Sequence, residues 1–315
     1  MVEKVFVGID TSNYTTSVAI CDYFGNIIKN FKLLLPVKKG ERGLRQSDTI
    51  FFHIKNLSKI AEKIKTEYEK YEIIAMGHSA FPRDVVDSYM PCFLVGKALS
   101  DILSALYHID NFSFSHQAGH IMASLYSSKL QEDDFIAFHV SGGTTEILKV
   151  KCINGEIKVD LIGGSKDLHA GQAIDRIGVK LGLGFPCGAK LEELANKNTE
   201  AIPKFKVSVK GYFCNLSGLE NLALDLIKKT DDLNLVSAFT LEFIYKTIEK
   251  LTSNIRSNFP NKPIVYAGGV MSNSIISTKL KNNFSNIYFA APEFSSDNAS
   301  GIALLTRLKF LSKED

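Results

Sequence analysis

The chain has 315 residues, of which 45% are hydrophobic and 23% charged, and its formal net charge is +3 at pH 7. This length is sufficient for two lobes with separate cores, and the composition is ordinary for a soluble globular enzyme. So small a positive charge does not by itself indicate a nucleic-acid-binding protein, and no run of residues is long and apolar enough to cross a membrane.

The cysteines are scattered along the chain without a CxxC pair. They are Cys21, Cys92, Cys152, Cys187 and Cys214. An odd and dispersed set favours reduced thiols over a disulfide framework. Because the chain also enters a strand-like run at once, we expect a cytoplasmic protein without a signal peptide.

Hydrophobic patterning predicts a first lobe over residues 1–132, in which three strands are followed by alternating helices and strands. The expected strands cover 4–10, 15–21, 26–34, 72–76 and 112–114. The expected helices cover 47–68, 93–106 and 116–126, and 82–91 is expected to be a loop. The polar stretch 129–134 predicts the boundary between the lobes.

The second predicted lobe, over 133–315, repeats this order of three strands followed by helices. Its expected strands cover 135–141, 145–151, 156–162, 263–267 and 287–290. Its expected helices cover 167–181, 191–196, 219–229, 233–258, 272–281 and 298–311, the last of them able to pack back on the first lobe. Two such halves predict a duplicated α/β architecture, the actin-like (ASKHA) two-lobe fold with a nucleotide cleft between the lobes.

Two segments, 5–21 and 135–150, resemble each other. Each has an apolar run, a turn of small residues, two threonines and a second apolar run. The turn residues are Asp10-Thr11-Ser12 in the first segment and Ser141-Gly142-Gly143 in the second. Small residues let a ligand approach the backbone, and N–H groups and hydroxyls in a turn bind phosphate oxygens. The pair therefore favours a nucleotide site, and the alternative is two unrelated hairpins.

His116 and His120 lie four residues apart, on one face of an expected helix, where two imidazoles can bind one metal ion. A zinc protease would require Glu directly after the first His, and here that residue is Gln117. Asp297 is a candidate third ligand. The alternatives are two polar residues on a helix surface and an Asp that caps a helix.

Glycines also precede two expected helices of the second lobe. Gly268 and Gly269 follow a strand and come just before Asn273, at the start of a helix, while Gly171 precedes Asp175 by one turn. Bare backbone at a helix N-terminus suits a ribose or phosphate, and a carboxylate one turn further on can bind ribose hydroxyls. A tight strand-to-helix turn and an Asp paired with Arg176 remain the alternatives.

Together these motifs resemble one family, the threonylcarbamoyl-adenosine tRNA transferases, over nearly the whole chain and in family order. The matching segments are Gly8–Ser12, His116–His120, Val140–Gly143, Asp167–Asp175 with Leu181–Leu183 and Pro186, Leu216–Leu219, Ala267–Val270 with Asn273, and Pro292–Phe294 with Asp297-Asn298. No single motif is specific, but seven of them in order are.

The resemblance implies an actin-like fold and one divalent metal ion, of the iron or zinc type, held by His116, His120 and Asp297. It implies transfer of a threonylcarbamoyl group from threonylcarbamoyl-AMP to an adenosine of tRNA. Asp10, in the first turn, is our candidate catalytic residue, and it is also the carboxylate that a kinase of this fold could use as a base. An ATP- or AMP-type nucleotide would be bound by residues of both turns and of the glycine segments. These are Thr11, Ser12, Ser141, Gly142, Gly143, Gly171, Asp175, Gly268, Gly269 and Asn273. A paralogous actin-like protein or a second copy of the chain is the expected protein partner.

The chain also departs from the family pattern near these motifs. The family has an acidic residue where this chain has Tyr14, His where it has Thr144, and Glu where it has Gln172. These changes indicate a divergent member or a paralogue with a related acyl or carbamoyl transfer. A non-catalytic nucleotide-binding partner protein and, less favoured, a small-molecule kinase of the same fold are the alternatives.

Overall fold

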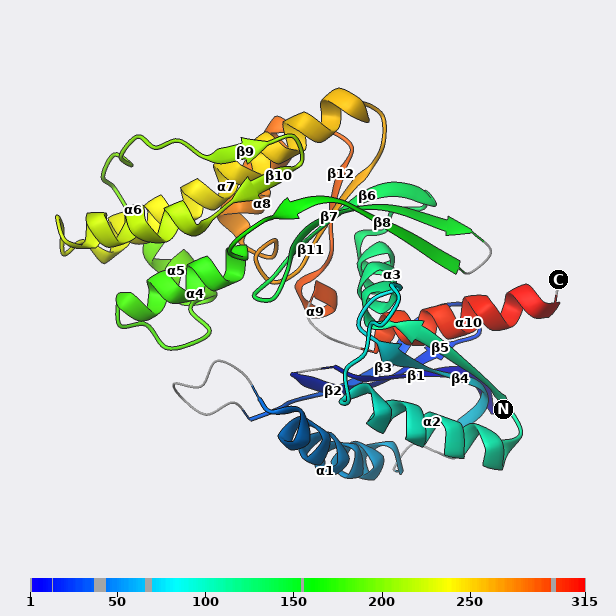
Figure 1. The fold of residues 1–315 in the computed structure, drawn as a ribbon. Coiled ribbons are helices and arrows are strands. Elements are labelled where there is room, and N and C mark those ends of the chain that lie inside the picture. The colour runs from blue at the N-terminus through cyan, green and yellow to red at the C-terminus, as the bar shows by residue number, and fades with distance from the viewer. Residues whose placement is uncertain are drawn as a thin grey trace. The chain divides into compact units, whose positions relative to one another are not determined.

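The structure, a computed structural model, describes residues 2–12, 14–36, 44–65, 70–153, 156–295 and 299–314 (Figure 1). The chain forms two compact units. Unit 1 comprises Met1–Ser127, Cys152–Val159 and Glu293–Asp315, and unit 2 comprises Ser128–Lys151 and Asp160–Pro292. The boundary predicted from the sequence is at 132/133, whereas the first segment of unit 1 ends at Ser127. The C-terminal segment, whose helix was expected to be able to pack back on the first lobe, belongs to unit 1.

Unit 1 is built on a five-stranded sheet in the order β3-β2-β1-β4-β5. Its strands are β1 (Glu3–Thr11), β2 (Thr15–Asp22), β3 (Ile27–Leu34), β4 (Tyr71–Phe81) and β5 (Asp110–Ser115). Its helices are α1 (Gln46–Lys65), α2 (Phe93–Tyr107), α3 (His116–Ser128) and α10 (Ser300–Glu314). The first three strands pair antiparallel, whereas β1, β4 and β5 pair parallel, so the carboxyl ends of β1 and β4 lie at one edge.

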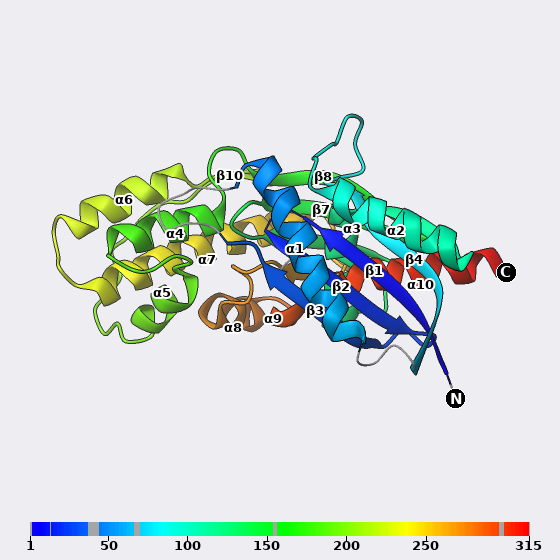
Figure 2. The ribbon, with the colours of Figure 1, turned by 90° about the horizontal axis from the view of Figure 1, so that it is seen from below.

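Helices cover both faces of this sheet: α1 and α2 lie on one face and α10 on the other (Figures 1 and 2). Small residues in the strands allow α10 to lie directly on the sheet. A Cβ at Gly8 would stand 2.3 Å from the backbone nitrogen of Ala303, and one at Gly77 would stand 2.0 Å from Oγ1 of Thr306. The sequence of β1 and β4 therefore fixes where α10 can pack.

Unit 2 is built on a seven-stranded sheet in the order β12-β11-β6-β7-β8-β10-β9. Its strands are β6 (Asp134–Val140), β7 (Thr145–Ile153), β8 (Glu156–Ser165), β9 (Ser208–Lys210), β10 (Phe213–Asn215), β11 (Ile264–Ala267) and β12 (Ile287–Phe289). Its helices are α4 (Ala170–Lys180), α5 (Gly188–Ala195), α6 (Ser217–Ile227), α7 (Leu233–Asn258) and α8 (Ser274–Asn283). The short α9 (Pro292–Ser295) begins at the last residue of unit 2 and otherwise belongs to unit 1. The first parts of β8 and the end of β7 belong to unit 1.

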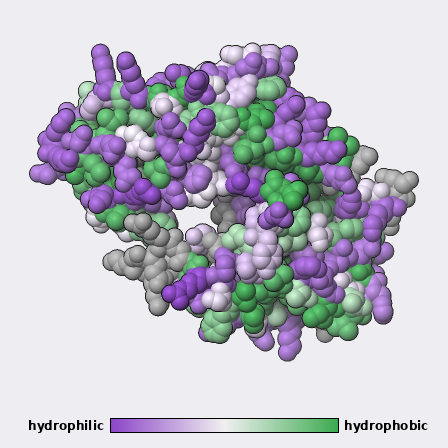
Figure 3. Space-filling model, in the orientation of Figure 1, coloured by the Kyte–Doolittle hydropathy of each residue, from purple (hydrophilic) through white to green (hydrophobic). Residues whose placement is uncertain are grey.

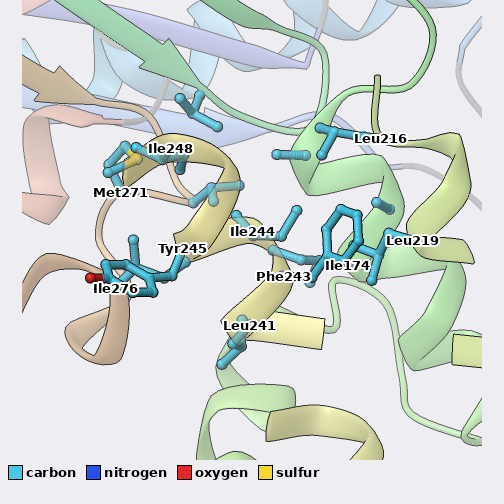
Figure 4. Close-up of a cluster of buried hydrophobic side chains, with 14 of the residues drawn as sticks. Ile174, Leu216, Leu219, Leu241, Phe243, Ile244, Tyr245, Ile248, Met271 and Ile276 are labelled. Carbon is cyan, nitrogen blue, oxygen red and sulfur yellow. The ribbon is translucent and has the colours of Figure 1, made fainter. Parts of the chain in front are cut away.

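The core of unit 2 is centred on α7, the longest helix described. Buried side chains of α7 meet those of α4, α6 and α8, as Figure 4 shows for Ile174, Leu219, Ile244, Ile248 and Ile276. Asp232 caps the helix, since its carboxylate accepts hydrogen bonds from the N–H groups of Asn234 and Leu235. Residues 236–241 of α7 are buried on all sides, whereas Glu242, Lys246 and Glu249 further along the helix are half-buried.

The structure confirms the predicted α/β class and most predicted elements, although several bounds differ; β4, for example, extends to Phe81 rather than to residue 76. The start of α4 is Ala170 rather than 167, because Asp167 instead accepts hydrogen bonds from the backbone of Leu168 and Leu216. The β9–β10 hairpin and α9 were not predicted, and α5 starts earlier than 191. Residues 66–68 of the first predicted helix lie outside the described residues. Within the parts of the chain that the structure describes, no helix has both the length and the apolar character needed to span a membrane.

Candidate functional site

In unit 1 the candidate site lies where β1 ends and α3 begins. Asp10 stands near the end of β1 with 1% of its surface exposed, and His116 is the first residue of α3. Nδ1 of His116 lies 2.9 Å from Oδ2 of Asp10. Nε2 of His116 lies 2.9 Å from Nε2 of His120, one turn further along α3. The predicted histidine pair and Asp10 therefore form one cluster.

This geometry fits a metal ion. When Nδ1–H of His116 donates to Asp10, Nε2 of His116 keeps the lone pair that a metal requires, as in the carboxylate–histidine–metal arrangement. Two nitrogens that each bind one ion at about 2.0–2.1 Å lie roughly 3 Å apart, close to the separation observed. Among the described residues no group of three His, Cys, Asp or Glu side chains forms a metal site, and the predicted third ligand, Asp297, lies outside them.

A helix crossing fixes α3, and with it the histidines. Gly119 lies between them in sequence and packs on α10: a Cβ at Gly301 would stand 1.8 Å from the carbonyl oxygen of Gly119, and one at Gly119 would stand 2.9 Å from Cδ1 of Ile302. Only glycine at 119 and 301 allows so close an approach. The close packing of α3 on α10 therefore explains why residue 119, within the histidine motif, is a glycine.

Ser79 is a residue of this cluster that the sequence analysis missed. Its hydroxyl donates to Oδ1 of Asp10 over 2.6 Å, so both carboxylate oxygens of Asp10 have a partner. Ser79 lies near the end of β4, which runs parallel to β1. A small polar residue after the apolar run of β4, at the same sheet edge as Asp10, was the signal available in the sequence.

The turn after β1 uses its hydroxyl groups inside unit 1. Thr11 is fully buried, and its Oγ1 donates to the carbonyl of Cys92 (3.0 Å) and accepts from the N–H of Gly96 (3.1 Å). Ser12 is 2% exposed, and its Oγ has no hydrogen-bond partner among the described residues. The structure thus assigns Thr11 to anchoring α2, while a polar ligand for Ser12 remains a prediction.

In unit 2 the turn 141–144 is exposed at Gly142 and Gly143, whereas the first turn is buried. Oγ of Ser141 accepts from the N–H groups of Gly143 (3.3 Å) and Thr144 (3.2 Å) and lies 2.8 Å from Oγ1 of Thr144. A Cβ at Gly142 or Gly143 would meet no atom within 4 Å. The hydroxyl groups of Ser141 and Thr144 stabilise this turn from its inner side, and no other atoms cover Gly142 and Gly143 on its outer side.

Two further glycine segments converge on this turn. A Cβ at Gly171 would stand 2.6 Å from the nitrogen of Gly142, and the N–H of Gly171 donates to the carbonyl of Ser141 (3.1 Å). Gly268 has φ +95°, and a Cβ there would stand 2.3 Å from the carbonyl oxygen of Val140. The predicted residues Ser141, Gly142, Gly171 and Gly268 are thus brought together at the carboxyl end of β6.

The N–H groups at this junction can bind an anion. Among the described residues, no acceptor contacts the N–H of Gly142 or of Gly269. A Cβ at Gly269 would also meet no atom within 4 Å. Bare N–H groups beside a strand end, with α4 starting at Ala170, form the kind of site that binds phosphate oxygens.

Asp175 and Asn273 make local hydrogen bonds. Oδ1 of Asp175 accepts from the N–H of Cys187 (2.8 Å), and burial raises the pKa of Asp175. Oδ1 of Asn273 accepts from the N–H of Ile276 (3.1 Å) and caps α8. These bonds account for both side chains, and their nucleotide-binding roles remain predictions.

A family model described as TsaD, tRNA N6-adenosine threonylcarbamoyltransferase, matches residues 89–304. Among similar relatives, the tRNA N6-adenosine threonylcarbamoyltransferase of Prochlorococcus marinus is 29% identical over 280 residues, which are 82% of this chain and 75% of that protein. The enzyme of the same name from Thermotoga neapolitana is 25% identical over 309 residues, which are 94% of this chain and 91% of that protein.

Solved structures show the fold. A full-length HypF in its phosphate- and nucleotide-bound form matches with a TM-score of 0.59 and 13% identity, over 99% of this chain and 46% of that chain. A ROK family glucokinase from Streptomyces griseus, in complex with glucose and AMPPNP, matches with a TM-score of 0.53 and 13% identity, over 96% of this chain and 99% of that chain. The predicted actin-like fold is therefore confirmed.

The relatives also decide the class of enzyme, because they are named as transferases and not as proteases. This agrees with Gln117, which stands where a zinc protease requires Glu. On the match of the family model over residues 89–304, the chain belongs to the tRNA N6-adenosine threonylcarbamoyltransferase family.

Proposed function

We propose that the protein transfers the threonylcarbamoyl group of threonylcarbamoyl-AMP to the exocyclic amine of an adenosine in tRNA, and that it requires a divalent metal ion. The observation that carries this proposal is the convergence of Nε2 of His116 and Nε2 of His120 at 2.9 Å, with Asp10 on Nδ1 of His116. His116, His120 and Asp297 would hold the ion. A metal at such a site supplies Lewis-acid polarisation of the donor's carbonyl or phosphate oxygens.

The reaction is an acyl transfer. The amine nitrogen forms a bond to the carbamoyl carbon, the bond from that carbon to the phosphate oxygen breaks, and AMP leaves with the electron pair. The amine proton passes to water. Asp10 is poorly placed to accept that proton, because Ser79 and His116 occupy its two oxygens. We therefore propose that Asp10 is a positioning residue, which holds the His116 ring and its tautomer.

The donor's AMP moiety would bind at the junction of the 141–144 turn with the segments around Gly171 and Gly268. Support comes from the bare N–H groups of Gly142 and Gly269 and from the open space above both residues. Thr144, which replaces the family's His, lies 2.8 Å from Ser141 through its hydroxyl and so keeps the turn braced. This substitution is compatible with nucleotide binding.

The test is a reconstituted reaction. The purified protein is incubated with tRNA, threonine, bicarbonate, ATP and the enzyme that makes the donor, and the nucleosides are analysed by mass spectrometry. We expect threonylcarbamoyladenosine from the wild type and none from His116→Ala/His120→Ala, which should also lose its metal.

His108→Asn is a matched control, because His108 is an exposed histidine at the end of α2 with φ +53°, a conformation that Asn adopts readily. Metal content is measured in parallel for all variants. Unchanged metal content in the double variant would contradict the metal site. A wild type that binds AMP but forms no product would favour the non-catalytic partner protein.

A further inference from the structure

A cavity of about 1040 Å³ lies in unit 2, away from the glycine turns. Its walls are the segment 202–207, one face of α7 and part of α8. Phe205 attaches the segment to α7, since its ring centroid lies 5.3 Å from that of Phe239 and 5.1 Å from that of Phe243. The α7 wall is a single helix stripe, formed by Glu242, Lys246, Glu249, Lys250 and Ser253.

The acidic groups of this cavity are already neutralised. Glu242 pairs with Lys279, and Glu249 pairs with Lys246 at 2.8 Å and accepts from Asn283 at 2.9 Å. Burial would raise the pKa of Glu249, but hydrogen bonds from Lys246 and Tyr245 lower it, so Glu249 remains ionised and balances Lys246.

Two lysines of the wall, Lys204 and Lys250, are both exposed, and neither has a carboxylate partner among the described residues. The cavity therefore carries an excess of two positive charges. Repulsion between unpaired ammonium groups at one cavity is relieved by an anionic ligand.

The positive charge continues along the chain. From 204 to 210 the exposed and half-buried residues alternate: Lys204, Lys206, Ser208 and Lys210 are exposed, while Phe205, Val207 and Val209 pack against the core. In an extended segment, alternate side chains share one face and repeat about every 6.7 Å. Neither Lys206 nor Lys210 has a carboxylate partner within the described ranges.

We define Lys204, Lys206, Lys210 and Lys250 as the lysine row. On the face shown in Figure 3, hydrophilic side chains are prominent over this end of unit 2, with apolar areas between them. The lysine row combines an extended line of cations with an open cavity. Of the rings beside it, Phe205 is packed on α7, and Phe213, which pairs with Lys210, is 38% exposed but its ring centroid lies 4.7 Å from Nζ of Lys166. This chemistry suits a phosphate backbone rather than bases.

We propose that the lysine row and its cavity bind the phosphate backbone of RNA, independently of sequence. The choice of tRNA as the RNA rests on the proposed function. Lysines on an edge strand also deter unwanted strand pairing, which is a different explanation for Lys210 on β9. It does not explain Lys204, Lys206 or Lys250, which lie outside any strand.

The test is tRNA binding by fluorescence anisotropy as a function of salt, with the whole protein. Lys204→Gln/Lys206→Gln/Lys250→Gln should bind tRNA roughly tenfold more weakly at low salt, and the slope of log K against log[salt] should fall by about 2–3. The matched control removes the same charge from exposed lysines of unit 2 elsewhere, Lys180→Gln/Lys228→Gln/Lys229→Gln, and should leave the slope near that of the wild type.

An unchanged affinity and slope in the first triple variant would overturn the proposal, as would equal losses in the two variants. If the wild type binds tripolyphosphate and the first triple variant does not, while both bind tRNA equally well, the lysines form a site for small anions, and this result also overturns the proposal. AMP binding is measured for both variants and should not change. If the wild type binds tRNA through the lysine row but transfers no group, the proposed function fails while this inference stands.

Discussion

The two turns that resemble each other in sequence have opposite chemistry in the structure. Asp10, Thr11 and Ser12 are at most 2% exposed, and the side chains of Asp10 and Thr11 bond to other elements of unit 1. Gly142 and Gly143, in contrast, are exposed and touch nothing on their outer side. A repeated strand–turn–strand pattern therefore predicts a repeated backbone. The side chains make the difference: Asp10 of the first turn bonds to His116, whereas the second turn presents bare N–H groups.

The largest effect on the difference between the two turns is expected from Asp10→Asn, which removes the carboxylate that bonds to His116. An amide cannot hold His116 as a carboxylate does, so we expect metal affinity to fall by about 10- to 100-fold. Metal titration followed by elemental analysis measures the loss. Ser79→Ala should cause a smaller loss, and the surface variant Asp48→Asn none. Unchanged affinity in Asp10→Asn would show that Asp10 does not position His116.

The second prediction separates glycines that are required for packing from glycines that are predicted to bind the nucleotide, within unit 2. Gly171→Ala should lower the free energy of unfolding by about 2–3 kcal/mol, because its Cβ would press on the backbone of Gly142. Gly142→Ala should change stability by less than about 0.5 kcal/mol, yet weaken AMP binding, since its methyl group would occupy the open side of the turn. Urea unfolding and AMP titration distinguish them. Similar stabilities for the two variants would refute the assignment.

The third prediction concerns acid stability. The pKa of Asp167 is lowered from its ordinary 3.8 to about 2. Burial by itself would raise this pKa, but hydrogen bonds from Ser217, Leu216 and Leu168 to the carboxylate lower it by more. A lowered pKa in the folded state stabilises the protein above pH 4, and this contribution is lost as the pH falls toward 2. Asp167→Asn should therefore be less stable at pH 6 and show a smaller loss of stability between pH 4 and 2. Thermal unfolding at several pH values checks this, and parallel curves for the two proteins would contradict it.

The smallest effect on stability is expected from the substitution of Ser12. Its buried hydroxyl has no partner among the described residues, so Ser12→Ala should leave stability within about 1 kcal/mol of the wild type or raise it slightly. If the hydroxyl binds the nucleotide as predicted, AMP affinity should fall at the same time. Unfolding curves and AMP titration of one preparation give both answers. A fall in stability alone would assign Ser12 to an internal role.

Periodicity and turn residues were enough to predict most elements, the turn that contains Asp10 and the helix that carries His116 and His120. They did not predict the β9–β10 hairpin, whose strands have only three residues each and join through Gly211 at φ +59°. Segments this short carry too little alternation to be recognised.

Residues that act through tertiary contact were harder still to predict. Ser79 became part of the site only because β4 lies beside β1. Thr11 was predicted to bind nucleotide, but its hydroxyl is used between Cys92 and Gly96, far away in sequence. A motif identifies the residue types that chemistry requires, whereas pairing across a sheet determines which of their atoms are already occupied.

The close crossing of Gly119 and Gly301 has a consequence for biosynthesis. Unit 2 is inserted into unit 1, so the ribosome makes α10 only after the whole of unit 2. Until then β1 and β4 lack the helix that covers one of their faces, and α3 lacks the surface that orients its histidines. Since domains generally fold as units during synthesis, unit 2 can mature first, and His116 and His120 reach their final positions late.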